Sequence, residues 1–290
     1  MTIPAPLLQT MRLGRWTTHL IQAGGMQLDG GAMFGVVPKT LWSRKITPDD
    51  KNRIPMCMRV LLIEHESGLI LVDTGSGSKD DAKFQGLYGI DNTVEGGITS
   101  LEAGIRAAGH APDDVTLVIN THLHFDHAGG NTVRDAAGAT APAFPNARYV
   151  VQAGEFHYAT HTNERTAGSY FDANYVPLVE RGRYDLIEGD REIIAGIRSR
   201  VTPGHTPHHQ SIVLEGDVPA CFVADVMPTA HHMPLPWIMG YDVELLRTLE
   251  AKRALLTVAD ADGWMVVFEH DPITASGRVT RDGKGFALAS

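Results

Sequence analysis

Residues 121–130, with the sequence THLHFDHAGG, constrain the fold of this chain more than any other segment. They directly follow residues 115–120, a short apolar run that is typical of a buried strand. Four potential metal ligands stand within six residues: His122, His124, Asp126 and His127. Imidazole and carboxylate groups are the ligands that zinc and similar divalent ions prefer. The fold must therefore bring several polar side chains together at the end of a strand.

The spacing within this segment favours two adjacent ions over one. On a strand that ends in a turn, His122 and His124 project to the same side. Asp126 and His127 lie on the following turn and can face a second point a few ångströms away. The alternative is a polar loop with chance histidines, and so particular a spacing disfavours it.

Three further ligand candidates follow where later strands are expected to meet loops. A loop fixed by proline and glycine, Thr-Pro-Gly-His-Thr-Pro, presents His205. Asp225 ends the apolar run 221–225, and His270 follows the apolar run 264–269. Junctions of this kind are where rigid scaffolds place active-site residues.

The rest of the chain alternates between strand and helix patterns. Strands are expected at residues 59–65 and 69–75 as a hairpin, and at 115–120, 148–152, 193–201, 210–214, 221–225 and 264–269. Helices are expected at residues 100–109 and 243–258, and residues 153–185 look helical or loop-like. This order predicts two mixed β/α halves whose sheets face each other, with helices outside. The halves are expected to share one core in a single domain over residues 1–290.

Composition narrows the class of protein. The 290 residues are 43% apolar and 20% charged, which is ordinary for a globular protein. The net charge of −9 argues against a nucleic-acid partner. No segment approaches the roughly 18 apolar residues of a membrane span, and the first 25 residues lack the apolar core of a signal peptide. We expect a soluble, cytoplasmic protein with no membrane partner, in which Cys57 and Cys221 are buried and unpaired.

The order of these motifs resembles the metallo-β-lactamase superfamily over residues 59–271. The resemblance implies an α/β (α+β) fold, a four-layer αββα sandwich with the site at one edge between the two sheets. It implies two metal sites, the first formed by His122, His124 and His205 and the second by Asp126, His127 and His270, with Asp225 and a hydroxide bridging both ions. Asp73, in the sequence Val-Asp-Thr-Gly, matches a family turn whose carboxylate orients a metal-bound imidazole. A simple turn aspartate is the alternative.

The resemblance also implies an activity. A dinuclear hydrolase would open lactone or ester bonds by attack of the bridging hydroxide, with Asp126 and Asp225 as catalytic residues and Asp126 as proton carrier. Zinc is the expected metal, and manganese, iron or cobalt suit the same ligands. Within the superfamily the pattern is similar to N-acyl-homoserine lactonases and related organophosphate hydrolases. The expected partner is therefore a small-molecule lactone or ester.

The residues that contact the substrate are less well defined. Several lactonases carry a tyrosine three residues after the bridging aspartate, and here Pro228 stands there. Either another residue replaces it or the substrate differs. The candidates for substrate contacts are His231, His232, Trp237, Phe34 and Tyr241. Residues 1–55 are expected to form a pocket wall or a homodimer contact.

Three other functions stay open. An organophosphate or aryl ester hydrolase would use the same ligands. A glyoxalase II-like thioesterase would as well, but it is expected to have a helical C-terminal region, and only about 20 residues follow His270. A non-catalytic metal-binding protein is the third, and the complete ligand set disfavours it.

Overall fold

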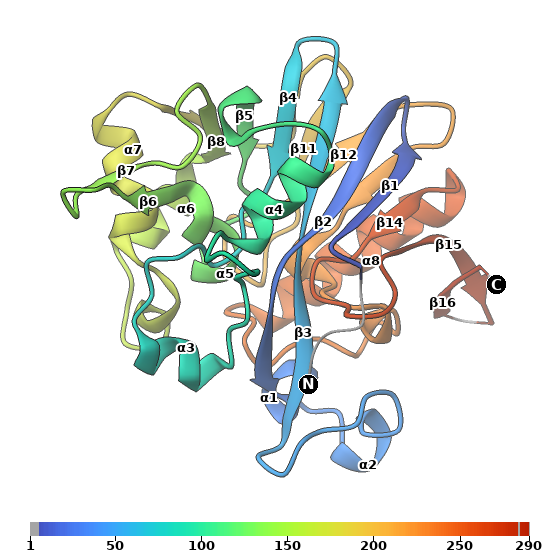
Figure 1. Cartoon of the computed structure of the whole chain (residues 1–290). Helices are drawn as coiled ribbons and strands as arrows, with labels where there is room; N and C mark the ends of the chain where they lie inside the picture. Colours follow the sequence, from blue (N-terminus) through green and yellow to red (C-terminus); the bar gives the residue numbers. More distant parts are fainter. Residues whose placement is uncertain (1–5, 284, 290) are drawn as a thin grey trace.

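The computed structural model describes residues 6–283 and 285–289, so the first five residues of the segment 1–55 lie outside it. Two mixed sheets of seven strands each face each other, and helices cover their outer surfaces (Figure 1). The first sheet has the order β1 (Leu8–Leu13), β2 (Trp16–Asp29), β3 (Arg53–His65), β4 (Gly68–Val72), β5 (Val115–Ile119), β8 (Arg148–Gln152) and β9 (Tyr184–Ile187).

The second sheet runs in chain order: β10 (Arg191–Ile194), β11 (Ile197–Val201), β12 (Gln210–Leu214), β13 (Ala220–Phe222), β14 (Met265–Val267), β15 (Ser276–Asp282) and β16 (Gly285–Leu288). A small hairpin joins β6 (Thr132–Arg134) to β7 (Thr140–Pro142). The α-helices are α1 (Gly30–Phe34), α2 (Lys39–Trp42), α3 (Ala82–Tyr88), α4 (Ser100–Ala107), α5 (Phe125–Ala128), α6 (Ala153–Thr160), α7 (Val176–Glu180) and α8 (Leu245–Ala261).

Successive side chains along a strand point to opposite faces of the sheet, so each strand contributes to two separate cores. In β3, Leu61 and Ile63 face the second sheet, where they meet side chains such as Phe222 of β13. Between them, Leu62 faces outward into the core beneath α4. Side chains on the far side of the second sheet pack against Leu255 of α8. Because both faces of each sheet are covered, inner strands such as β3 and β4 are apolar on both faces.

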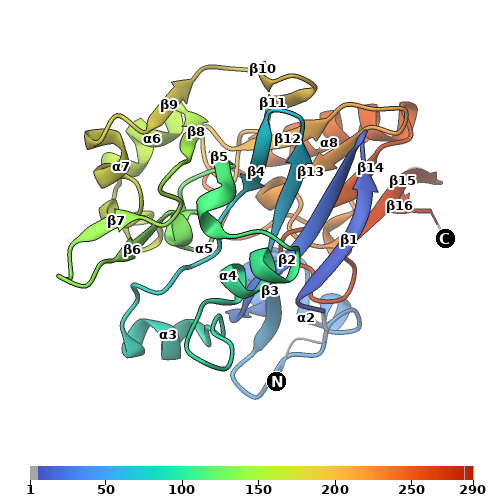
Figure 2. The ribbon, with the colours of Figure 1, turned by 45° about the horizontal axis from the view of Figure 1, so that its top comes forward.

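The four-layer αββα prediction is therefore confirmed. Figure 2 shows α4 lying over β2 and β3, and α8 on the far side of the second sheet. Gly104 permits the close approach of α4 to β2, since a Cβ there would lie 2.1 Å from the Ile21 side chain. In the described part of the chain, no helix has the length and apolar content needed to cross a membrane. Cys57 and Cys221 are buried and unpaired, as expected.

Most errors in the predicted elements concern strands. The segment 193–201 is a hairpin of β10 and β11 that turns at Gly196. The runs 221–225 and 264–269 leave the sheet early, at Phe222 and Val267. Seven strands were not predicted from the sequence: β1, β2, β6, β7, β9, β15 and β16. In β2 the alternation is broken by a register shift between Gln22 and Gly25, so no simple period-two pattern exists there.

Candidate metal centre

The candidate ligands gather at one edge of the molecule because of strand direction. In the first sheet β4 and β5 are parallel, so Asp73 and His122 follow strands that end at the same edge. In the second sheet β13 and β14 are parallel, and β11 has the same direction. The segments that carry His205, Asp225 and His270 therefore leave that sheet on one side. Ligands in open sheets of this kind bind beyond the carboxyl ends of strands.

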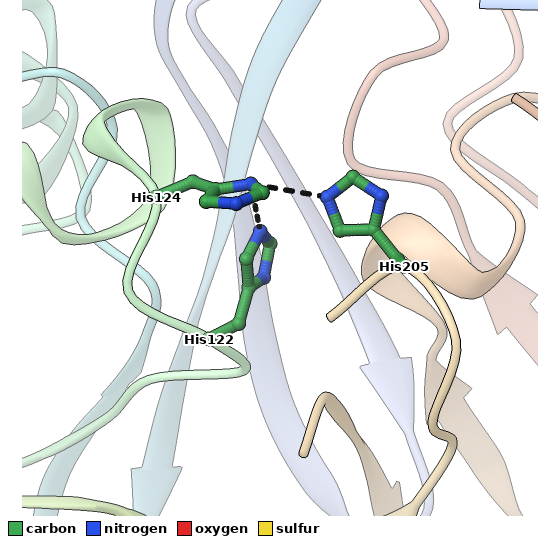
Figure 3. A group of neighbouring side chains, drawn as sticks. All are labelled: His122, His124 and His205. Atoms are coloured by element: carbon green, nitrogen blue, oxygen red, sulfur yellow. Dashed lines mark hydrogen bonds between the residues drawn. The ribbon is translucent and has the colours of Figure 1, made fainter. Parts of the chain in front are cut away.

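The first group contains His122, His124 and His205 (Figure 3). His122 Nε2 and His205 Nε2 each lie 3.1 Å from His124 Nδ1. Four ligands at bond lengths of about 2.0–2.1 Å around a tetrahedral ion lie roughly 3.3 Å apart. The three nitrogens are thus spaced as ligands of one such ion would be.

The second group contains Asp126, His127 and His270. His127 Nε2 lies 3.2 Å from His270 Nε2, and Asp126 Oδ2 lies 3.7 Å from each of these nitrogens. Asp126 and His127 belong to α5, the short helix that directly follows His124. One turn of chain therefore contributes to both groups, as the sequence spacing predicted.

Asp225 connects the two groups. Its Oδ2 lies 3.0 Å from His205 Nε2, and its Oδ1 lies 3.0 Å from His270 Nε2. The carboxylate is buried, and each of its two oxygens faces a histidine of a different group. The preceding residue, Ala224, has a φ of 47°, a left-handed conformation that non-glycine residues rarely adopt. Strain of this kind is typical of functional sites, where the surrounding structure holds it in place.

Asp73 lies beneath the centre and contacts both strand ends. It accepts hydrogen bonds from the backbone N–H of Thr121 at 2.8 Å and from its hydroxyl at 2.6 Å. Its Oδ2 lies 3.1 Å from His127 Nδ1, and the Thr121 hydroxyl lies 3.1 Å from His122 Nδ1. These contacts fix two imidazole rings from behind, which is how proteins usually orient metal-bound histidines.

Two carboxylates that were not predicted from the sequence, Asp242 and Glu269, support histidines in a similar way. His205 Nδ1 donates to Asp242 Oδ1 at 3.0 Å. Glu269 Oε2 lies 3.1 Å from His127 Nδ1, and both residues are buried. Glu269 adjoins His270 at a strand end, which was a usable signal. Nothing in the local sequence around Asp242 marks it.

The loop after β11 is fixed by further buried polar groups. Glu155 accepts hydrogen bonds from the N–H of Leu123 at 3.1 Å and from the Thr206 hydroxyl at 2.6 Å, so it ties the loops of His122 and His205 together. His209 accepts a hydrogen bond from the N–H of Asp225 at 3.2 Å. This histidine therefore supports the centre from outside both ligand groups.

The protonation of these groups suits a bound cation. Burial lowers the pKa of His122 and His124 well below the ordinary value, so both rings are neutral, as metal ligands must be. Burial also opposes a charge on His270, but the charge of Asp225, the hydrogen bond to it and the charge of Glu269 together raise the pKa of His270 to about 9. The carboxylates thus favour positive charge between them. The buried histidines and the carboxylates of Asp126 and Asp225 form a donor set that fits divalent metal ions.

A cavity of about 380 Å³ opens above the centre, with Asp126 and Asp225 among its lining residues. Its wall comes from segments that are distant in sequence: Leu28, Ala32, Met33, Tyr88, Phe125, Arg165, Thr166, Ser169, Met239, Gly240, Tyr241 and Val243. Most of these side chains are apolar or aromatic. This volume and lining are typical of sites for small organic molecules.

Of the five residues expected to contact a substrate, only Tyr241 lines this cavity. Phe34 is fully buried behind the wall. Its ring stacks on His232 with 4.8 Å between ring centroids, and it makes a T-shaped contact with Trp237 with 5.6 Å between centroids. His232 donates through Nε2 to the carbonyl of Met33, a residue that does line the cavity.

The other four residues, Phe34, His231, His232 and Trp237, lie outside the cavity wall. Phe34, His232 and Trp237 lie behind the wall because they pack together in the small core around α1 and α2, which supports the wall. The segment 1–55 contributes Leu28, Ala32 and Met33 to the wall, and its β1 and β2 belong to the first sheet. Tyr88 is a lining residue that the sequence analysis missed.

Comparisons with known proteins agree with this geometry. Residues 59–270 match the family model of the Metallo-beta-lactamase superfamily. The chain is 32% identical over 263 residues to an N-acyl homoserine lactonase of a Bacillus species, an alignment that covers 87% of this chain and 92% of that protein. The chain belongs to the metallo-β-lactamase superfamily and is a metal-dependent hydrolase related to the N-acyl-homoserine lactonases.

Two solved structures have a similar fold. A probable metal-dependent hydrolase from Staphylococcus aureus superimposes with a TM-score of 0.85 at 28% identity, covering 97% of this chain and 99% of that one. AidC, a dizinc quorum-quenching lactonase in complex with an N-acyl-homoserine product, superimposes with a TM-score of 0.79 at 18% identity, covering 97% and 96%.

Proposed function

We propose that this protein is a dinuclear lactonase that hydrolyses N-acyl-homoserine lactones. The observation that carries the proposal is the pair of ligand groups joined by Asp225 on the floor of a largely apolar cavity. The relationship to an N-acyl homoserine lactonase supports the same substrate class. A lactone ring would lie over the ligand groups, and the acyl chain would lie against the apolar wall.

The proposed ligands of one ion are His122, His124 and His205. Those of the other are Asp126, His127 and His270, and Asp225 contributes to both. Zinc is the proposed metal, because histidine and carboxylate ligands suit it and the similar lactonase AidC is a dizinc protein. Bound ions of this kind supply activated water at neutral pH and polarise a substrate carbonyl.

The side chains of this protein have distinct parts in such a reaction. Asp126 is the ligand candidate with the largest exposed fraction of carboxylate, 11%, and it lines the cavity. It is therefore placed to pass a proton to the alkoxide that leaves when the ring opens. Asp73 and Asp242 hold the histidines of the two groups in fixed orientations. This preorganisation means that little rearrangement is needed during the reaction.

Several lactonases carry a tyrosine at the position of Pro228, and two tyrosines in the cavity wall of this protein can take over its role. Tyr88 and Tyr241 both line the cavity. Burial raises the pKa of Tyr241 to about 12, and burial together with the charge of Asp126 raises the pKa of Tyr88. Both hydroxyls thus stay protonated at neutral pH and can donate a hydrogen bond to a carbonyl oxygen. Tyr241 is our candidate for this contact, because it stands beside the loop that supports His205.

Hydrolysis of a small substrate panel by the zinc-loaded protein tests this proposal. The panel contains a long-chain N-acyl-homoserine lactone, an aliphatic δ-lactone, an aryl ester, paraoxon and a glutathione thioester. We expect turnover of the homoserine lactone with kcat/KM above roughly 10⁴ M⁻¹s⁻¹, lost with chelator and restored by zinc. If the lactones were inert while paraoxon or the thioester reacted, the dinuclear site would stand and the substrate class would be wrong.

A further inference from the structure

A second cluster of potential metal ligands lies on the outer face of the first sheet. It contains His19 of β2, Glu64 of β3 and His110, which follows α4, and we name it the outer cluster. Glu64 pairs with Leu69 at the start of β4, whereas the centre described above lies beyond the end of β4. The outer cluster is therefore at the opposite end of the sheet from the catalytic residues.

The three side chains converge on one point. His19 Nε2 and His110 Nε2 each lie 3.1 Å from the same carboxylate oxygen, Glu64 Oε1. This spacing matches the 3.1 Å separations within His122, His124 and His205. Ligands of a tetrahedral ion with bonds of about 2.0–2.1 Å lie at similar separations, roughly 3.3 Å.

The surroundings of the cluster also suit an ion. His19 Nδ1 lies 2.9 Å from the Thr10 hydroxyl, so the far nitrogen of this ring already has a partner that fixes its orientation. The side chain of His19 is 7% exposed, whereas those of Glu64 and His110 are 42% and 28% exposed. An ion can thus enter from solvent, and water can complete its coordination.

We propose that His19, Glu64 and His110 bind one divalent transition-metal ion, with zinc as the probe, independently of the dinuclear centre. Two imidazoles and one carboxylate form a ligand set that zinc accepts. The bound ion would attach the chain after α4 to β2 and β3, which already pair with each other as antiparallel strands. Its expected effect is on stability and metal content, and hydrolysis is expected to stay unchanged.

The test counts zinc ions per chain by mass spectrometry after dialysis against about 10 µM free zinc, a level that fills a site of micromolar affinity. The variants are His110→Ala and Glu64→Gln, each compared with the wild-type protein. The control is His161→Ala, which removes one member of an exposed histidine pair on and after α6. We expect both variants to hold one ion fewer than the wild type, the control to hold the same number, and all four proteins to hydrolyse the best substrate within about twofold of each other.

An equal ion count in wild type and variants would overturn the proposal and leave the cluster as an ion pair. Because the result is a difference, it does not depend on how many ions the catalytic centre holds. Calorimetric titration of zinc into wild-type protein whose centre is already loaded provides a second measurement that needs no variant. It must show one further binding event per chain, and its absence would also overturn the proposal.

Discussion

The metal centre and the wall of the cavity above it are built in different ways. In the centre, nearly every ligand candidate is buried and has a hydrogen-bond partner behind it, such as Asp242 behind His205 or the carbonyl of Cys57 behind His270. Most of the wall comes from loops and short helices, and Tyr241 is still 40% exposed. The centre is therefore a rigid polar network, and the wall is a looser apolar surface.

Because of this difference, we expect the centre to determine metal binding and the reaction, and the wall to determine which substrate binds. Ligands at the ends of strands are positioned by two whole sheets, so their geometry changes little when a loop changes. Loops tolerate substitution, and a family can therefore alter its substrate without altering its metal ligands. If this division holds here, substitutions in the centre will change metal content and rate together, and substitutions in the wall will change substrate affinity alone.

The largest effect is expected from Asp225→Ala. This change removes the only carboxylate that contacts both groups in the described structure, and it leaves His205 and His270 without their shared partner. We expect at least about a 10³-fold fall in kcat/KM and a loss of bound metal, since even partners behind the ligands contribute 10- to 100-fold. Metal analysis and the rate with the best panel substrate measure this. Asp217→Ala, on an exposed turn before β13, is the control, and an active, metal-loaded Asp225→Ala would refute the proposed centre.

Asp242→Asn is expected to have a smaller effect and to show how the two regions are linked. Asp242 accepts from His205 Nδ1 through one oxygen and from the N–H of Met239, a wall residue, through the other at 3.2 Å. We expect a 10- to 100-fold weaker zinc affinity in competition with a chelator, together with a raised KM. Asp260→Asn, which affects only a surface ion pair with Arg281, is the control. Unchanged zinc affinity would mean that the centre needs no support from the wall.

The same division explains what the sequence could predict. The seven ligand candidates could be predicted because they stand in short motifs at or just after strand ends, and such motifs are visible in the local sequence. The layers were predicted for the same reason, from apolar runs such as the one around Leu62. The bulged strand β2 was missed because a register shift hides its period.

The wall could not be predicted, because it depends on which loops meet in space. Phe34, His232 and Trp237 have the composition of a binding surface, but they pack on one another behind Met33. Tyr88 lies at the end of a helix whose sequence suggests nothing about a cavity. Asp242 acquires its contact with His205 only through a tertiary arrangement that spans 37 residues.

Tyr241→Phe tests the wall alone. Only the hydroxyl is lost, so we expect kcat/KM to fall by about 3- to 10-fold, which corresponds to one hydrogen bond of about 0.5–1.5 kcal/mol. The zinc content should not change. Tyr158→Phe is the matched control, since Tyr158 packs in the outer core away from the cavity. A loss of zinc in Tyr241→Phe would show that wall and centre are one unit, against the division argued above.

The smallest expected effect is a change in stability with pH that depends on Lys252, a residue that supports the loop leading into the wall. Lys252 of α8 is buried and donates to the carbonyls of Pro234 at 2.9 Å and Trp237 at 2.8 Å, in the loop that leads into the wall. Burial lowers its pKa from 10.5 to about 7. Between these two values the unfolded chain binds more protons than the folded chain, so the contribution of Lys252 to stability rises with pH.

We therefore compare the free energy of unfolding of wild type and Lys252→Met at pH 7 and pH 9. The variant is expected to be less stable at both, because the two carbonyls lose their donor. The informative quantity is the change with pH: the wild type should gain stability relative to Lys252→Met as the pH rises. Arg253→Met, which removes an exposed neighbouring cation, should run parallel to the wild type. If Lys252→Met also ran parallel, the amine would keep its ordinary pKa, and the wall would rest on a fully charged lysine that is better solvated than its burial indicates.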